Sequence, residues 1–413
     1  MGKTLKGACV FAQSGGPTSV INASAYGVIK TALESEHITA VYGAANGVVG
    51  ILNDVLYDMG KEDAAELALL LNTPSSELGS CRYKLKPFSE DDTDYKKIHE
   101  LFKRLDVRYF FYNGGNDSMD TCQKISDYFA TVGYECRVIG IPKTIDNDLC
   151  GTDHSPGFGS AAKYIATSVA EVHKDNNVYD TGSVAIIEAM GRHAGWLTGA
   201  AALAQLASAG PDLIYLPEIV FDMDRFIADV QDVYDVKKKC LVVVSEGIQY
   251  ADGTFVSEAT TSSSDGFAHA QLGGLATILA NAVKTRLGAK VRGIELSLLQ
   301  RCGAHLASKT DIDEAFGVGA FAVQSAVSGE SGKMVALKRA DINGEYVCSF
   351  ELEPLGIVAN NEKTVPREWI NEAGNYVNDE FISYALPLIQ GDANRATENG
   401  LPRFASLKKV RVQ

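Results

Sequence analysis

The sequence predicts an α/β protein with mostly parallel sheets, divided into two domains. Short apolar runs alternate with longer segments of helical periodicity, which is the pattern of parallel strands joined by crossover helices. The chain has 413 residues, more than one ordinary hydrophobic core accommodates, so two domains are expected. Hydrophobic residues make up 46% and charged residues 22% of the sequence, as in a globular protein with a buried core.

Eight apolar runs have the length and composition of buried strands. They are residues 7–12, 40–43, 107–112, 137–141, 184–188, 213–216, 241–245 and 291–296. Helices are predicted where apolar residues recur at helical spacing, at residues 18–33, 118–132, 160–175 and 272–287. Pro17 favours the start of the first helix, because proline suits a first helical position.

In two regions the apolar residues follow neither helical nor strand spacing throughout. Residues 249–268 contain Asp252-Gly253 and a polar run from Thr260 to Asp265, which predicts a long surface loop serving as a lid or an interface insertion. The C-terminal region from Asn343 onward is predicted to be a mixture of short strands and helical pieces.

Charge and cysteine content narrow the function. The formal net charge of −14 disfavours nucleic acids and anionic membranes as partners, so an anionic substrate must be held by local cations. We find no apolar stretch long enough to cross a bilayer. The eight cysteines are scattered without a C-x-x-C pair, which predicts reduced thiols and a cytoplasmic protein.

Two short segments carry the strongest functional signal. Residues 114–118 read Gly-Gly-Asn-Asp-Ser, and residues 142–148 read Pro-Lys-Thr-Ile-Asp-Asn-Asp; each directly follows a predicted strand. Glycines at the carboxyl end of a parallel strand let backbone amides approach a phosphate. Helix capping would account for Asn116 or Asp117 alone. An Asx turn would explain one aspartate of residues 142–148, but it does not explain the whole cluster. The pair of turns therefore predicts a phosphoryl-transfer site.

The side chains in these turns suit that chemistry. Asn116 and Asp117 offer oxygen ligands for Mg²⁺. One carboxylate of the pair Asp146 and Asp148 can accept a hydroxyl proton while the other helps organise the metal and the loop. Lys143 can neutralise charge on the transferring phosphoryl group.

Two earlier segments are candidates for binding the donor phosphates. Residues 13–18, Gln-Ser-Gly-Gly-Pro-Thr, join the first strand to the first helix and can present backbone amides to an anion, although a tight turn alone is the alternative. Arg82 follows a Gly-Ser turn and can present a forked cation to phosphate, although an ordinary surface arginine is the alternative.

Later segments offer groups for a sugar phosphate. Residues 190–196, Met-Gly-Arg-His-Ala-Gly-Trp, form another strand–glycine–helix turn, with Arg192 placed for a phosphate. Glu246 ends an apolar strand and suits hydrogen bonds to sugar hydroxyls, while Arg292 and Arg301 add two cations. Taken singly, Glu246 can equally be a helix cap, and the two arginines can be solvated surface charges.

The order of these motifs resembles that of the phosphofructokinase family. The segments GGPT, GS-x-R, GGNDS, PKTIDND, MGR, SEG and QR run in that order from the first predicted strand to about residue 313. The resemblance implies two Rossmann-like three-layer domains: residues 1–158 with about 300–345 for the donor, and 159–299 with about 346–413 for the sugar phosphate. It also implies reversible phosphoryl transfer to the C1 hydroxyl of fructose 6-phosphate in glycolysis or gluconeogenesis, with Mg²⁺ as cofactor, by a homo-oligomer (a dimer or tetramer).

The resemblance also implies roles for single residues. Asp146 matches the family's general base, and Gly15 and Arg82 map to the donor-phosphate side. The positions implied to hold the sugar phosphate are Thr144, Ile145, Met190, Gly191, Arg192, Glu246, Leu298, Arg301 and Arg292, the last often contributed by a neighbouring subunit.

Two positions predict the donor. ATP-using relatives have glycine where this chain has Asp117 and Lys143, and those glycines leave room for the nucleotide's α-phosphate. A carboxylate at Asp117 would occupy that space and repel it, whereas Lys143 can bind pyrophosphate. The sequence thus resembles the pyrophosphate-dependent branch of the family.

Three positions depart from the family's pattern. Asn116 stands where an aspartate usually binds Mg²⁺, Leu298 where relatives have His or Tyr against the sugar phosphate, and Ser183 where bacterial ATP enzymes carry an arginine that crosses between subunits. Two alternatives stay open: an ATP-dependent sugar-phosphate kinase, which Asp117 and Lys143 disfavour, and a non-catalytic regulatory subunit that binds sugar phosphates, which Asn116 and Leu298 favour.

Overall fold

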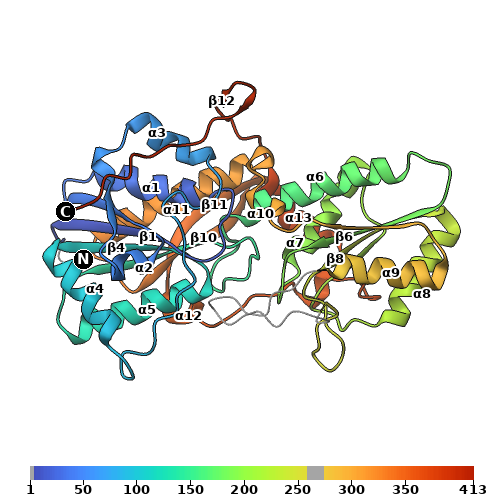
Figure 1. Ribbon diagram of the computed structural model, residues 1–413, viewed down its shortest axis with the longest axis horizontal. Coiled ribbons are helices and arrows are strands. Elements are labelled where there is room, and N and C mark those ends of the chain that lie inside the picture. The colour runs from blue at the N-terminus through green and yellow to red at the C-terminus, as the bar shows by residue number, and fades with distance from the viewer. Residues whose placement is uncertain (1–3, 258–273) are drawn as a thin grey trace.

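The computed structural model describes residues 4–257 and 274–413, which form two lobes, each built on its own sheet (Figure 1). The first sheet has seven strands in the order β11-β10-β5-β4-β1-β2-β3. All neighbours pair in parallel except β2 with β3 and β10 with β11. The strands are β1 (Gly7–Gln13), β2 (Ile38–Ala44), β3 (Leu56–Asp58), β4 (Val107–Gly114), β5 (Arg137–Pro142), β10 (Lys333–Ile342) and β11 (Glu345–Pro354).

Helices cover both faces of this first sheet, which gives three layers. Their apolar faces pack on the sheet because they carry buried aliphatic and aromatic side chains at helical spacing. One face is covered by α2 (Val48–Leu52), α4 (Thr93–Arg104), α5 (Asn116–Thr131) and α12 (Leu355–Val358). The other is covered by α1 (Ile21–Leu33), α3 (Ala64–Leu69) and α11 (Lys309–Val327).

The second sheet has four parallel strands in the order β7-β8-β6-β9. They are β6 (Ser183–Ala189), β7 (Leu213–Tyr215), β8 (Lys239–Ser245) and β9 (Val291–Glu295). One face packs on α6 (Phe158–Asn176), α7 (Trp196–Gly199) and α13 (Asp379–Ala385), and the other packs on α8 (Met223–Lys237) and α9 (Leu275–Leu287). The short helix α10 (Leu299–Cys302) follows the edge strand β9.

The structure confirms the predicted α/β class. All eight predicted strands are present within two residues of the expected bounds, and the four predicted helices correspond to α1, α5, α6 and α9. Of the predicted loop 249–268, the described part begins as a turn closed by a bridge between Gln249 and Phe255, and residues 258–268 lie outside the described residues. Within the described ranges, no helix is both long and apolar enough to cross a membrane.

The C-terminal region is shared between the lobes. The strand β11 pairs with β10 along its whole length in the first sheet, and residues near the C-terminus return there, where the backbone N–H of Val412 donates to Leu56 O. Between them, α13 packs its Phe381 in the core of the second lobe. The expected assignment of residues 346–413 to the sugar-phosphate domain therefore describes α13 but not β11 or the tail, because β11 completes a hairpin with β10.

Candidate active site

The adjacency of three parallel strands brings the predicted donor motifs together. β1, β4 and β5 are neighbours in the first sheet, so the turns that leave their carboxyl ends meet at one edge. The backbone N–H of Lys143 donates to Gly114 O at 3.1 Å, which joins the turn after β5 to the turn after β4. Residues 114–118 and 142–148 thus form one surface, as their positions after strands predicted.

A cleft of about 610 Å³ opens at this edge and extends to the second lobe. Ten of the predicted site residues line it: Gly15, Arg82, Asn116, Asp117, Lys143, Thr144, Asp146, Met190, Arg192 and Glu246. Asp148, the predicted partner of Asp146, lines it as well. Polar residues that were not predicted as site residues also line it: Lys84, Ser118, His193, Asn360, Asn361 and Glu362.

Lys143 is a buried cation at the floor of the donor side. Its Nζ donates to Gly16 O at 2.6 Å and would lie 3.2 Å from a Cβ placed on Gly15, so glycine at position 15 keeps that approach open. Burial lowers the pKa of Lys143 to about 8, and Arg82 and Arg301 add to this effect, while Asp146 opposes it. An anion bound beside this ammonium group would favour its protonated form.

Two aspartates follow Lys143 in the same turn. The backbone N–H of Asp146 donates to Thr144 Oγ1 at 3.1 Å, and Asn147 between the aspartates adopts a left-handed φ of 56°. Burial raises the pKa of Asp146, while Lys143 and Arg192 oppose the rise. Burial also raises the pKa of Asp148 to about 7, helped by the charge on Asp146. A carboxylate with a raised pKa is a stronger base than a solvated one.

Cations surround the donor side. Lys84 Nζ lies 3.4 Å from Asp117 Oδ1, so the carboxylate at the start of α5 is paired with a cation at the cleft. Burial lowers the pKa of Arg82, and the neighbouring Arg301 and Arg192 lower it further. Arg301 Nη1 would lie 3.2 Å from a Cβ on Gly16, which places this predicted sugar-phosphate ligand next to the donor turn. Clustered cations of this kind repel one another until an anion binds.

The second lobe contributes the wall opposite the donor turns. The Glu246 carboxylate accepts from the backbone N–H of Gly191 at 3.4 Å, and Ser245 Oγ donates to Gly191 O at 2.5 Å. Gly191 has a φ of 131°, which only glycine adopts without strain. Burial raises the pKa of Glu246 to about 7, and the charge on Asp146 acts in the same direction. The two motifs after β6 and β8 therefore support each other.

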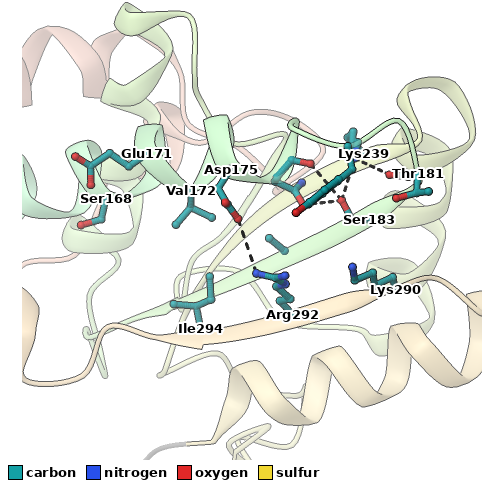
Figure 2. Close-up of a pocket in the computed structure, with 13 residues that line it drawn as sticks. Ser168, Glu171, Val172, Asp175, Thr181, Ser183, Lys239, Lys290, Arg292 and Ile294 are labelled. Atoms are coloured by element: carbon teal, nitrogen blue, oxygen red, sulfur yellow. Dashed lines mark hydrogen bonds and ion pairs between the residues drawn. The ribbon is translucent and has the colours of Figure 1, made fainter.

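Three predicted residues lie elsewhere. Ile145 is buried in the core of the second lobe, and Leu298 is 54% exposed before α10. Arg292 lies on the edge strand β9, where its guanidinium is 3.8 Å from Asp175 Oδ2 in a separate hollow that Ser183 also lines (Figure 2). Within a single chain, Arg292 therefore does not reach the cleft residues described above.

Residues 360–362 are the cleft residues that lie furthest from any motif found in the sequence. They follow α12 and have no glycine motif, charge cluster or preceding parallel strand that would identify them. The hydrogen bonds of Asn360 and Asn361 with Asn116 link positions more than 240 residues apart. Nothing local in the sequence signals such a contact.

Partly buried carboxylates and the buried cation Lys143 share one cleft at strand ends. This arrangement is suited to stabilise a phosphoryl group in transfer and places the chain among the phosphotransferases. The sequence model of the phosphofructokinase family matches residues 8–324 of this chain. The chain therefore belongs to the phosphofructokinase family.

Relatives agree with this assignment along the whole chain. The chain is 46% identical to the pyrophosphate–fructose 6-phosphate 1-phosphotransferase of Halomonas elongata, over 98% of this chain and 96% of that protein. It is also 46% identical to the Xanthomonas campestris protein of the same name, over 98% and 97% of the two chains. The crystal structure of pyrophosphate-dependent phosphofructokinase from Nitrosospira multiformis superposes with a TM-score of 0.89 at 40% identity, covering 98% of each chain.

Proposed function

We propose that this protein transfers a phosphoryl group from pyrophosphate to the C1 hydroxyl of fructose 6-phosphate, giving fructose 1,6-bisphosphate and orthophosphate, in either direction. The observation that carries the donor assignment is the pair Lys143 and Asp117 in one cleft, at positions where ATP-using relatives have glycine. Relatives named for this activity, at 46% identity over nearly the full chain, support it.

Asp146 is the proposed general base. Its carboxylate takes the proton of the C1 hydroxyl as the hydroxyl oxygen forms its bond to the distal phosphorus of pyrophosphate. The bridging P–O bond breaks, and its electron pair leaves with orthophosphate. The raised pKa of Asp146 favours this proton transfer, while Lys143 and Arg192 oppose the rise and favour the ionised form.

Lys143, Arg82 and Arg301 are the proposed stabilisers of the developing charge. Pyrophosphate and the leaving phosphate carry several negative charges, while the chain has a net charge of −14, so local cations must overcome the overall repulsion. Besides burial, Arg82 and Arg301 lower the pKa of Lys143, Arg301 also lowers the pKa of Arg82, and a bound anion would relieve this repulsion. The protein contributes positioning and charge neutralisation, as expected for phosphoryl transfer.

Mg²⁺ is the proposed cofactor, and the donor side has suitable ligands. Mg²⁺ is commonly bound by one or two carboxylates together with substrate phosphates. Asp148 fits this role because its carboxylate lines the cleft and has a pKa raised to about 7 by partial burial and by the charges on Asp146 and Glu362, which a cation would offset. Asp117 at the same cleft is the second candidate. When bound, the ion would neutralise charge on the phosphate oxygens.

Glu246 and the turn around Gly191 are the proposed sugar-binding wall, with Met190 and Arg192 beside them. We also propose that the lobes are two functional domains, one for the donor on the first sheet and one for the sugar phosphate on the second. The eight cysteines are free thiols, which supports a cytoplasmic location.

Arg292 supports a homo-oligomer. It lies outside the cleft on the exposed edge strand β9, so it can serve a sugar phosphate only in the cleft of a second copy. The resemblance to the family implies such sharing, and we propose it for this chain.

A coupled assay of the purified protein tests the proposal. Fructose 6-phosphate and Mg²⁺ are supplied with pyrophosphate or with ATP in parallel reactions. Turnover with pyrophosphate alone is expected. Turnover with ATP alone would agree with Asp146 as the base but refute the roles of Asp117 and Lys143 in donor selection. Absence of turnover with both donors would favour a regulatory subunit.

A further inference from the structure

We propose that Asn116 acts as a clasp, a side chain that fixes another segment by hydrogen bonds, rather than as a Mg²⁺ ligand. The oxygen and the nitrogen of its side-chain amide both bond residues 358–365, here called the strap, and hold them across the donor end of the cleft. The strap restricts the donor to two phosphates. The selectivity part of this proposal rests on the proposed function, whereas the clasp itself does not.

The strap connects the two lobes. It leaves α12, where Leu355 and Val358 are buried in the core of the first lobe, and it reaches Val365 in the core of the second (Figure 1). The backbone N–H of Val365 donates to Glu218 Oε1 at 2.9 Å. Both ends are therefore anchored by burial, and the segment between them passes over the cleft. All of it lies beyond residues 8–324, the part matched by the family.

The amide of Asn116 matches the strap backbone at two points. Its Oδ1 accepts a hydrogen bond from the backbone N–H of Asn360 at 2.5 Å. Its Nδ2 donates to the carbonyl oxygen of Asn361 at 2.7 Å. An ionised aspartate accepts but cannot donate, so at this position it would set an anion against the Asn361 carbonyl. This pairing gives a physical reason for asparagine where the family usually has aspartate.

A second anchor ties the strap to the catalytic turn. The backbone N–H of Lys363 donates to Asp148 O at 2.7 Å. Its half-buried Nζ donates to Asp153 O at 2.6 Å and to Thr152 O at 3.2 Å. The indole N–H of Trp196 donates to Lys363 O at 2.9 Å. The strap is thus bonded to both donor-side motifs and to the first turn of α7 in the second lobe.

This placement makes the strap one wall of the donor site. Asn360, Asn361 and Glu362 line the cleft beside Asn116 and Asp148. The Glu362 carboxylate adds negative charge next to Asp146 and Asp148. A donor with a third phosphate would have to displace this wall or approach that carboxylate. The recognised donor class is therefore a diphosphate, and linear triphosphates are excluded.

Two variants test the clasp and the wall separately. Asn116→Asp keeps the side-chain size but removes the donor to Asn361 O. Glu362→Gln removes the charge of the wall but leaves the clasp. Asn399→Asp, at an exposed turn with a φ of 52° between β12 (Thr397–Glu398) and β13 (Leu401–Pro402), is the matched control for the added charge.

The first measurement is hydrogen–deuterium exchange of residues 355–366 without substrates. Asn116→Asp should speed exchange there at least about tenfold, and Glu362→Gln and Asn399→Asp should not. Unchanged exchange in Asn116→Asp would overturn the clasp, and this result does not depend on any turnover.

The second measurement compares kcat/KM for tripolyphosphate and pyrophosphate. The ratio should rise about fivefold or more in Asn116→Asp and in Glu362→Gln. In Asn116→Asp the added negative charge alone would lower this ratio, so a rise identifies loosening of the strap. An unchanged ratio with faster exchange would overturn the selectivity. A lower half-saturating Mg²⁺ concentration with a protected strap would instead identify position 116 as a metal ligand. Absence of pyrophosphate turnover in the unmodified protein would refute the proposed function and leave the exchange result valid.

Discussion

The side-chain ammonium of Lys143 donates a hydrogen bond to the carbonyl oxygen of Gly16 at 2.6 Å, across 127 positions of sequence. This contact joins the turn after β1 to the turn after β5 and buries the cation at the donor end of the cleft. Burial lowers the pKa of Lys143 to about 8, so an anion bound there would gain from restoring its charge. The donor site is therefore built from two turns rather than from one phosphate-binding loop.

Replacing the proposed base should stop turnover while sparing binding. Asp146→Asn keeps the shape of the side chain but removes the proton acceptor, so kcat should fall by about 10²- to 10⁴-fold. The dissociation constant for fructose 6-phosphate, measured by calorimetry without a donor, should change less than about threefold. Asp232→Asn on the exposed face of α8 is the matched control. A normal kcat in Asp146→Asn would refute the assignment.

Removing the buried cation should weaken use of the donor specifically. A hydrogen bond to a charged group contributes about 1.5–3 kcal/mol, so Lys143→Met should raise the KM for pyrophosphate by about 10- to 100-fold. The KM for fructose 6-phosphate should stay nearly constant in steady-state assays. The double variant Asp117→Gly, Lys143→Gly should lose pyrophosphate activity as well, and full activity in that protein would contradict the donor site described above.

The activity should depend on pH through two groups of opposite sign. Lys143 must be protonated to bind pyrophosphate, so kcat/KM for pyrophosphate should fall as the pH rises through about 8. Asp146 must be ionised to act as a base, so activity should fall as the pH drops through its pKa, which burial raises above the ordinary range of an aspartate.

The pH–activity profile should therefore have an acid limb set by Asp146 and an alkaline limb set by Lys143. A comparison of variants separates these two limbs from the ionisation of the substrates. In Lys143→Met the alkaline limb should disappear while the residual activity keeps its acid limb. Both proteins are measured with the same substrates, so a difference between their profiles reports the protein. An alkaline limb that persists unchanged in Lys143→Met would show that another group causes it.

Arg292 should act in the cleft of another copy. Arg292→Ala should raise the KM for fructose 6-phosphate about tenfold or more, because a phosphate ligand is lost. Mixing Arg292→Ala with Asp146→Ala and allowing subunits to exchange should restore part of the activity, since hybrid sites combine an intact base with an intact arginine. Each variant incubated with itself is the control. A monomer in light scattering, with normal fructose 6-phosphate affinity in Arg292→Ala, would contradict the sharing.

The predictable part of the site is the part encoded next to strands. Gly15, Lys143 and Asp146 follow buried strands within a few residues, and the order of a parallel sheet brings such turns together. Leu298 was predicted from the resemblance alone and Arg292 also as an added cation, and the structure places neither in the cleft of its own chain. Both residues lie at or just after β9, the edge strand of the second sheet. Whether they reach a cleft depends on the position of this edge relative to other parts of the fold or to a second copy, which no local sequence pattern encodes.

The sequence by itself determined the eight strands, the α/β class and the motifs at the strand ends, because apolar runs, glycines and polar residues act over a few neighbouring positions. Only the tertiary structure decided what Asn116 contacts, since its partners Asn360 and Asn361 are 244 and 245 positions away. It also decided the pKa values of Lys143 and Asp146, because burial and neighbouring charges arise only when distant segments pack together.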